Sequence, residues 1–333
     1  MIPSKSLFSL AAMFLFVSPS IAEQADKPKS ATHSLTISHA PYHGWADAIT
    51  IRNEKVEAIV VPDVGRVMQF KFVGEDTGAF WENAEMNGKT GDPDAKEWRN
   101  IGGDKSWPAP QSDWETMLGR TMPPPVAFDA LPCTAEVKDN AVIMTSPVDK
   151  DFGIRVIRRI ELKPNAAEMQ ITTRYEKVSG PPKRVSIWVI TQCNDPVMIF
   201  MPIPHGTAFK MGYDVQFGGK PPDLLNRDGV ITFTRDKDSN HKIMNDSDSL
   251  AWVGEKLALK ISSPRKAKAE YPDHGSSAQI YTSPGNWDYI ELELLDQLHE
   301  LKSGDKAEKA VNYTLYHRTN ADAEVEGRKI LKR

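Results

Sequence analysis

The chain has 333 residues, of which 40% are hydrophobic and 26% charged, and its formal net charge at pH 7 is −4. Nucleic-acid-binding proteins usually present a basic face, so this mildly acidic balance argues against a nucleic-acid partner. The length is enough to bury a large core, either in one large all-β domain or in two smaller ones.

The N-terminal segment has the pattern of a secretory signal peptide. Lys5 gives it a positive start, residues 7–17 are largely apolar, and Ser20 and Ala22 are the small residues of a cleavage site. The apolar run is shorter than the roughly 20 residues of a membrane span, and no later segment is apolar enough to cross a bilayer. We therefore predict an exported protein, periplasmic or secreted, without membrane insertion.

Three parts are expected along the chain. The signal peptide occupies residues 1–22, a polar, flexible lead-in follows at residues 23–40, and a single domain takes up residues 41–333. The two cysteines are Cys133 and Cys193. In an oxidising compartment they could form a disulfide, and two buried free thiols are the alternative.

Alternation of apolar and polar residues is the commonest pattern in the domain. It predicts strands at residues 67–72, 154–162 and 169–175. Residues 185–192 are apolar on both faces, which predicts a central strand covered on both sides. Many strands and few helical patterns predict antiparallel sheets packed face to face, with one short helix at residues 321–332.

Two stretches lack a strand pattern, residues 82–128 and residues 202–228, and both are rich in Gly and Pro. We predict long loops there, and long loops inside a compact domain are often functional. The first stretch contains Trp98, Trp107 and Trp114 among the polar side chains of Arg99, Asn100, Asp104, Lys105 and Gln111. Flat rings beside polar groups suit a sugar, which has apolar C–H faces and a rim of hydroxyls. The alternative is that the tryptophans fill one end of a sandwich.

Residues 289–295 alternate most clearly. One face carries Tyr289, Glu291, Glu293 and Leu295, and the other carries Ile290, Leu292 and Leu294. The apolar face is expected to bury, which leaves two carboxylates about 6.5–7 Å apart along the strand on the other face. Such a pair can share a polyol, a proton or a cation, and a solvated acidic face is the alternative.

Short motifs near the C-terminus resemble those of galactose mutarotases and related aldose epimerases. The motifs, in chain order, are Gln279-Ile-Tyr-Thr, Ile290-Glu, Leu301-Lys-Ser-Gly-Asp and Tyr313-Thr-Leu-Tyr. Glu57-Ala-Ile-Val-Val-Pro-Asp-Val-Gly and Phe80-Trp-Glu-Asn add to the resemblance upstream. The resemblance covers roughly residues 45 to 317, and over this range the chain is similar to a bacterial branch of that superfamily. The resemblance implies a large two-sheet antiparallel supersandwich.

The resemblance also implies roles for particular residues. Glu291 takes the place of the glutamate that acts as general base at the anomeric hydroxyl of the sugar. The Arg-x-x-Gly-Gly and Trp-Pro pattern resembles a segment whose arginine touches substrate, which points to Arg99, although two extra residues separate it from the glycines. Mutarotases carry their acid histidine on a central strand, but residues 188–194 contain none, so Gln192 there can bind a hydroxyl and cannot protonate one.

Two side chains are weak candidates for the missing acid. Lys105 qualifies if burial lowers its pKa, and His274 qualifies because it lies just before the strand that contains Gln279. The residues expected to contact substrate are Arg99, Asp104, Trp107, Gln192, Tyr281 and Glu293. No cofactor is expected, with one alternative: oxygens of Glu291, Glu293 and either Asp104 or Asp273 could bind calcium.

These observations leave three hypotheses for the function. In the first two the partner is a mono- or oligosaccharide, and in the third there is no sugar partner. A sugar-binding protein requires a tryptophan beside an accessible Glu291. An aldose epimerase also requires an acid about 5–7 Å from Glu291, across a space the size of a sugar. A structural domain requires both glutamates to be paired with nearby Lys or Arg. Phosphate-binding loops, the Gly-x-Ser-x-Gly elbow and His-Glu-x-x-His are missing from the sequence, which disfavours the corresponding chemistries.

Overall fold

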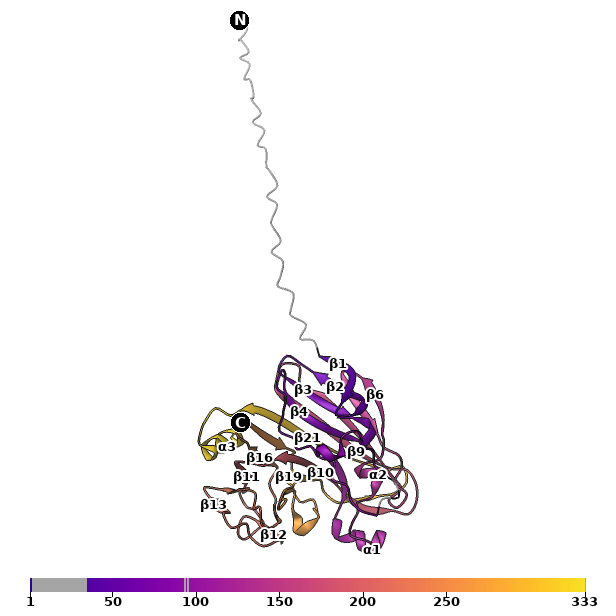
Figure 1. Ribbon diagram of the computed structural model, residues 1–333, viewed down its shortest axis with the longest axis vertical. Helices are drawn as coiled ribbons and strands as arrows, with labels where there is room; N and C mark the ends of the chain where they lie inside the picture. The colour runs from indigo at the N-terminus through magenta and orange to yellow at the C-terminus, as the bar shows by residue number, and fades with distance from the viewer. Residues whose placement is uncertain (2–34, 93, 95, 333) are drawn as a thin grey trace. The chain divides into compact units, whose positions relative to one another are not determined.

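Antiparallel β-strands organise the chain. The computed structural model describes Met1, residues 35–92, Asp94 and residues 96–332. In this part of the chain the strands form two sheets, one of 11 strands and one of 10 (Figure 1). The prediction of an all-β, two-sheet antiparallel supersandwich is therefore confirmed. The predicted signal peptide at residues 1–22 lies outside the described residues.

The first sheet contains the strands that carry the candidate site. In spatial order it consists of β1 (Thr36–Tyr42), β2 (Trp45–Arg52), β3 (Val56–Val61), β4 (Arg66–Phe72), β5 (Asp104–Ala109), β10 (Lys183–Asn194), β19 (Tyr289–Leu295), β18 (Ala278–Thr282), β15 (His241–Asn245) and β12 (Asp214–Phe217), with β20 (His299–Leu301) also paired to β10. Because β10 pairs with β5 on one side and β19 on the other, segments far apart in the sequence become neighbours.

The second sheet covers one face of the first. Its spatial order is β13 (Leu225–Arg227), β14 (Val230–Phe233), β11 (Met198–Pro202), β16 (Ser249–Val253), β17 (Leu257–Ser262), β21 (Lys306–His317), β9 (Glu168–Lys177), β8 (Ile154–Leu162), β7 (Ala141–Thr145) and β6 (Thr134–Lys138). The sequence pattern explains these strands: in β8 the alternate residues from Ile154 to Leu162 are buried and those between them are partly exposed.

Helices are short in the described part of the chain. They are α1 (Trp114–Leu118), α2 (Val126–Asp129) and α3 (Ala323–Leu331), with 3-10 turns η1 (Pro62–Val64), η2 (Ala84–Met86), η3 (Gln111–Asp113) and η4 (Asp273–Gly275). The predicted terminal helix is confirmed as α3. Its first turn is capped by the Asp322 side chain, which accepts hydrogen bonds from the backbone N–H groups of Glu324 and Val325. None of the described helices is both long and apolar enough to span a membrane.

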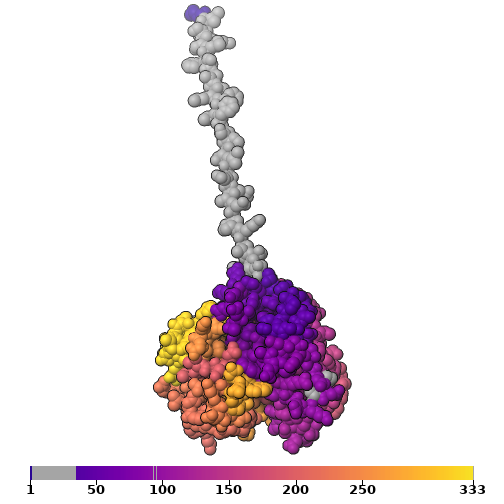
Figure 2. All heavy atoms as spheres, in the orientation of Figure 1, coloured from indigo at the N-terminus to yellow at the C-terminus, as the bar shows by residue number. Residues whose placement is uncertain are grey.

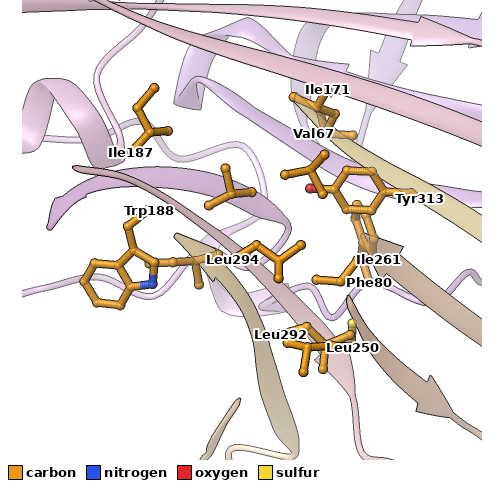
Figure 3. Close-up of a cluster of buried hydrophobic side chains, with 14 of the residues drawn as sticks. Val67, Phe80, Ile171, Ile187, Trp188, Leu250, Ile261, Leu292, Leu294 and Tyr313 are labelled. Atoms are coloured by element: carbon orange, nitrogen blue, oxygen red, sulfur yellow. The ribbon is translucent and has the colours of Figure 1, made fainter. Parts of the chain in front are cut away.

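The main hydrophobic core lies between the two sheets (Figure 3). Val67, Ile187, Leu292 and Leu294 enter it from the first sheet, and Ile171, Leu250, Ile261 and Tyr313 from the second. All eight are at most 1% exposed. Cys193 is buried in this core and Cys133, partly buried, packs against it; both are free thiols, so the disulfide alternative was wrong.

The strand predictions at residues 154–162 and 289–295 agree with β8 and β19 to the residue. Residues 185–192 lie within β10, which is central and buried on both faces, as predicted. Three predictions were wrong. The predicted loop at residues 202–228 contains the strands β12 and β13. Residues 36–40 belong to strand β1 rather than to a flexible lead-in. The predicted loop at residues 82–128 contains β5, a strand whose polar side chains are buried, so that it shows no apolar period.

A buried carboxylate joins the two sheets. Asp104 of β5 forms a salt bridge with Arg158 of β8 and accepts 2.6 Å hydrogen bonds from the hydroxyls of Thr191 in β10 and Tyr313 in β21. Arg158 also donates to the Asp104 backbone carbonyl at 2.9 Å. Asp104 is fully buried and Arg158 is 4% exposed, so each charge depends on the other for compensation.

Replacing this carboxylate is expected to destabilise the fold. Asp104→Ala leaves the Arg158 guanidinium buried without its charged partner, which costs about 3–5 kcal/mol. Urea unfolding of the purified protein measures the change. The control is Asp238→Ala, at an exposed residue whose replacement is expected to change stability by about 0.5 kcal/mol or less. Equal unfolding midpoints for the two variants would contradict the assignment.

Candidate functional site

Two glycines allow β5 to enter the first sheet. Gly102 and Gly103 have φ values of 101° and 71°, a region that favours glycine. A Cβ at Gly102 would lie 2.5 Å from the carbonyl oxygen of Trp81, and one at Gly103 would lie 2.6 Å from that of Val67. The Gly-Gly pair therefore serves close backbone packing, and it sets the position at which β5 begins.

Strand alternation then separates the side chains of β5. Asp104 points into the sandwich, so its neighbour Lys105 lies on the opposite face of the sheet. Register aligns further polar residues on that face: Gln192 is opposite Glu291, Glu291 is opposite Tyr281, and Tyr281 is opposite Lys242. Five neighbouring strands, from β5 to β15, thus bring together residues from distant parts of the sequence.

Glu291 is held by two donors. The Lys105 ammonium lies 3.2 Å from Glu291 Oε1, and Gln192 Nε2 donates to the same oxygen at 2.9 Å. The Glu291 side chain is 10% exposed, whereas that of Lys105 is fully buried. Burial lowers the pKa of Lys105 below the ordinary value for lysine, and the neighbouring Glu291 carboxylate opposes this shift. Lys105 was a candidate acid on the condition that burial lowers its pKa, and the pKa is shifted in that direction.

Glu293, two residues along β19, is in a drier environment. Its Oε2 atom lies 2.9 Å from the Lys242 ammonium and accepts a 2.7 Å hydrogen bond from Trp188 Nε1. Burial raises the pKa of Glu293 to about 7, although Lys242 opposes the shift. Among the described residues neither Glu293 Oε1 nor Gln279 Oε1 has a hydrogen-bond partner. These two residues are opposite each other in register, so a proton on Glu293 would supply the missing donor.

Both lysines of this face also contact tryptophan rings. The Lys105 ammonium lies 4.8 Å from the ring centroid of Trp107 and 5.5 Å from that of Trp98, and Lys242 lies 4.3 Å from that of Trp188. Cations over aromatic faces are stabilised by the ring quadrupole, more strongly when water is excluded. The predicted solvated acidic face is therefore wrong: each glutamate is buried and paired with a lysine.

A continuous series of aromatic rings, here called the aromatic row, lies beside Glu291. Its members in order of contact are Trp98, Trp287, Trp81, Tyr289, Tyr281 and Phe217, with successive centroid distances of 6.5, 6.2, 4.7, 6.2 and 6.1 Å. In Figure 2 atoms from the last third of the chain lie against atoms from the first third at the surface. Sequence reasoning missed Trp81 and Trp287 as site residues, although Trp81 belongs to the Phe80-Trp motif.

Trp107 is placed differently from the prediction. It is only 5% exposed, and its Nε1 donates to Asp129 Oδ1 at 2.9 Å. Trp98 Nε1 donates to the other oxygen of Asp129 at 3.2 Å, and Arg66 forms a 2.6 Å salt bridge with the same carboxylate. Trp107 is therefore a buried support beneath Lys105, and Trp98 is the more accessible ring.

Three other predicted residues lie away from Glu291. Asp104 is inside the sandwich, so its predicted contact with substrate does not fit its position. His274 is exposed, and its Nδ1 lies 2.9 Å from Asp214 Oδ2 rather than beside Glu291. Arg99 is exposed and, with Trp98, lines a separate pocket of about 270 Å³ whose lining includes Asp149 but not Glu291.

The carboxylates proposed as calcium ligands are not arranged around a common site. Glu291 and Glu293 are each bonded to a lysine, and Asp104 is on the opposite face. Asp273 accepts a 2.7 Å hydrogen bond from Gln279. Within the described ranges there is no group of three or more His, Cys, Asp or Glu side chains arranged to hold a metal ion.

Comparison with known proteins identifies the fold. Neither a family model nor a curated protein matches the sequence. Among solved structures, a galactose mutarotase related enzyme from Lactobacillus acidophilus is 12% identical with a TM-score of 0.54, over 83% of this chain and 99% of the other. A galactose mutarotase-like protein from Lactobacillus casei is 11% identical with a TM-score of 0.51, over 81% and 100%. The Slr1438 protein from Synechocystis sp. PCC 6803 is 13% identical with a TM-score of 0.54, over 85% and 99%.

The chain therefore has the galactose mutarotase-like fold, in agreement with the resemblance seen in its motifs. At this level of identity the comparison establishes architecture, and the chemistry must come from the side chains.

The raised pKa of Glu293 predicts a specific pH dependence of stability. Below pH 4.5 the Glu293 carboxyl is protonated in both the folded and the unfolded protein. Between pH 4.5 and about 7 only the folded protein keeps this proton, so the free energy of unfolding falls as the pH rises through this window. Glu293→Gln removes this contribution. Between pH 4.5 and 7 the urea midpoint of the variant is therefore expected to fall less than that of the wild type. Exposed Glu300→Gln is the control. A Glu293→Gln profile parallel to the wild type would contradict the prediction.

Proposed function

We propose that the protein binds a carbohydrate at the face around Glu291. The observation that carries the proposal is the Glu291 carboxylate, whose side chain is 10% exposed and already oriented by Lys105 and Gln192, beside the more accessible rings of Trp287, Trp81 and Tyr281. Trp287 is 43% exposed, and Trp81 and Tyr281 are partly exposed. Aromatic faces suit the C–H faces of a sugar, and the carboxylate suits its hydroxyl donors.

Binding without turnover fits the distances better than catalysis does. Interconversion of anomers needs a base at the anomeric hydroxyl and an acid at the ring oxygen. Lys105 touches Glu291 at 3.2 Å, whereas two groups that act on opposite sides of a sugar bond are about 5–10 Å apart. A sugar does not fit between them in this arrangement.

An aldose 1-epimerase is the second candidate, because burial lowers the pKa of Lys105. A lysine with a lowered pKa can both donate and accept a proton closer to neutral pH than an exposed one. In this candidate Glu291 is the base, Lys105 is the acid, and the two separate when the sugar enters. The galactose named for two of the similar folds favours a sugar as the substrate.

A purely structural role is the third candidate, since both glutamates are paired with lysines. A structural role explains the position of Glu293, which is fully buried, better than that of Glu291. It gives no reason for the exposure of Trp287, because an exposed ring contributes little to folding. We therefore assign Glu293 and Lys242 a supporting role and Glu291 the contact with the ligand.

The expected experiment is saturation-transfer NMR of the purified protein with a panel of monosaccharides and oligosaccharides. Glu291→Gln is expected to weaken binding tenfold or more, because hydrogen bonds to charged groups contribute about 1.5–3 kcal/mol. The exposed Glu300→Gln variant is expected to bind as the wild type does. The same samples report anomer exchange: acceleration that is lost in Glu291→Gln would favour the epimerase. Silence across the panel would overturn the carbohydrate proposal.

We also propose that the protein acts outside the cytoplasm of its host, on the strength of the N-terminal sequence pattern. Cleavage after Ala22 is expected to give a mature chain that starts at Glu23. N-terminal sequencing and intact mass of the protein expressed in a secreting bacterial host test this. Replacing Ala22 by a bulky residue, Ala22→Phe, is expected to block cleavage at this site. A chain from the periplasm or medium that retains residues 1–22 would contradict the prediction.

A further inference from the structure

The aromatic row is longer than one sugar ring needs. We infer, on the basis of the proposed function, that the ligand is an oligosaccharide of several units that lies along the row, and that a monosaccharide occupies only part of the site. A pyranose is about the size of one aromatic six-membered ring, so it can stack on one ring at a time. Trp287 also lies 6.2 Å from Tyr289, which is only 2% exposed, so the separate stacking positions are the exposed rings of Trp287 and Phe217 on either side of Tyr289.

The row extends to both sides of Glu291. Toward one side, Lys105 of β5 bonds Glu291 and also lies over the ring of Trp98. Toward the other, Tyr281 of β18 is opposite Glu291 in register, and the ring of Phe217 lies 6.1 Å from that of Tyr281. Phe217 belongs to β12 at the edge of the sheet. Five strand intervals separate β5 from β12, which corresponds to a width of about 24 Å.

The exposed members of the row lie on these two sides. Trp287, in contact with Trp98, is 43% exposed, and Phe217, in contact with Tyr281, is 42% exposed. Single exposed apolar residues are common on proteins, but connected ones mark sites of interaction. Rings of this kind stack on the apolar faces of successive sugars, and the Glu291 carboxylate between them, held in place by the buried Lys105, supplies an acceptor for hydroxyls.

Charge also favours a neutral chain over an anionic one. Near the middle of the row each of the two glutamates is matched by one lysine. Asp288 lies at the surface, where its carboxylate accepts a 2.9 Å hydrogen bond from Trp81 Nε1. Among these five described side chains three carboxylates accompany two lysines, so the geometry fits neutral hexoses better than uronic acids.

Isothermal titration calorimetry with neutral gluco-, galacto- and manno-oligosaccharides of one to six units tests the inference. For the series that binds, Kd is expected to fall at least tenfold between one and four units. Phe217→Ala is expected to raise Kd for the tetrasaccharide at least fivefold and to leave Kd for the monosaccharide within twofold, because Phe217 lies beyond Tyr281. Leu225→Ala, at a residue that is 56% exposed on β13 of the other sheet, is the matched control and is expected to change neither value.

The outcomes separate this inference from the function on which it rests. Binding with the same Kd at every chain length, or equal effects of Phe217→Ala and Leu225→Ala, would overturn the oligosaccharide inference and leave carbohydrate binding intact. Failure of every series at every length to bind would overturn both. Circular dichroism of each variant establishes that the substitution has not altered the fold.

Discussion

The salt bridge between Asp104 and Arg158 is the interaction on which the candidate site depends. It joins β5 of the first sheet to β8 of the second inside a dry core, and two hydroxyls complete its hydrogen bonds. Because neighbouring residues of a strand point to opposite faces, fixing Asp104 inward places Lys105 outward, against Glu291. A slip of one residue would bring the lysine into the core and the aspartate to the site.

Environment then gives the two glutamates of β19 different properties. Glu293 is fully buried with Lys242 and Trp188, and its pKa is raised to about 7. Glu291, two residues away on the same face, has a side chain that is 10% exposed and lies beside the aromatic row. The two identical side chains therefore differ in burial and in partners: Glu293 is enclosed by Lys242 and Trp188, whereas Glu291 is held by Lys105 and Gln192.

The fold is shared with galactose mutarotase-like proteins, but the polar groups on the central strand set limits on chemistry. Gln192 orients Glu291 through a 2.9 Å hydrogen bond and has no proton to transfer at neutral pH. The group best placed to transfer one is Lys105, which lies too close to Glu291 for a sugar to stand between them. The proposed recognition of a sugar by stacking and hydrogen bonding needs no such separation, and the row of rings is its proposed stacking surface.

The sequence by itself determined the strands whose residues alternate, β8 and β19 among them, and the central position of β10. It also predicted Glu291 and Lys105 as site residues, and the structure pairs these two side chains. Period two is a local property, so it can be predicted without knowing partners. Only the tertiary structure decided that β5 is a strand, that Asp104 points inward, and that Trp81 and Trp287 join Trp98 beside the site. Those features depend on pairing between segments far apart in the chain, where buried charges are compensated by partners that no local pattern reveals.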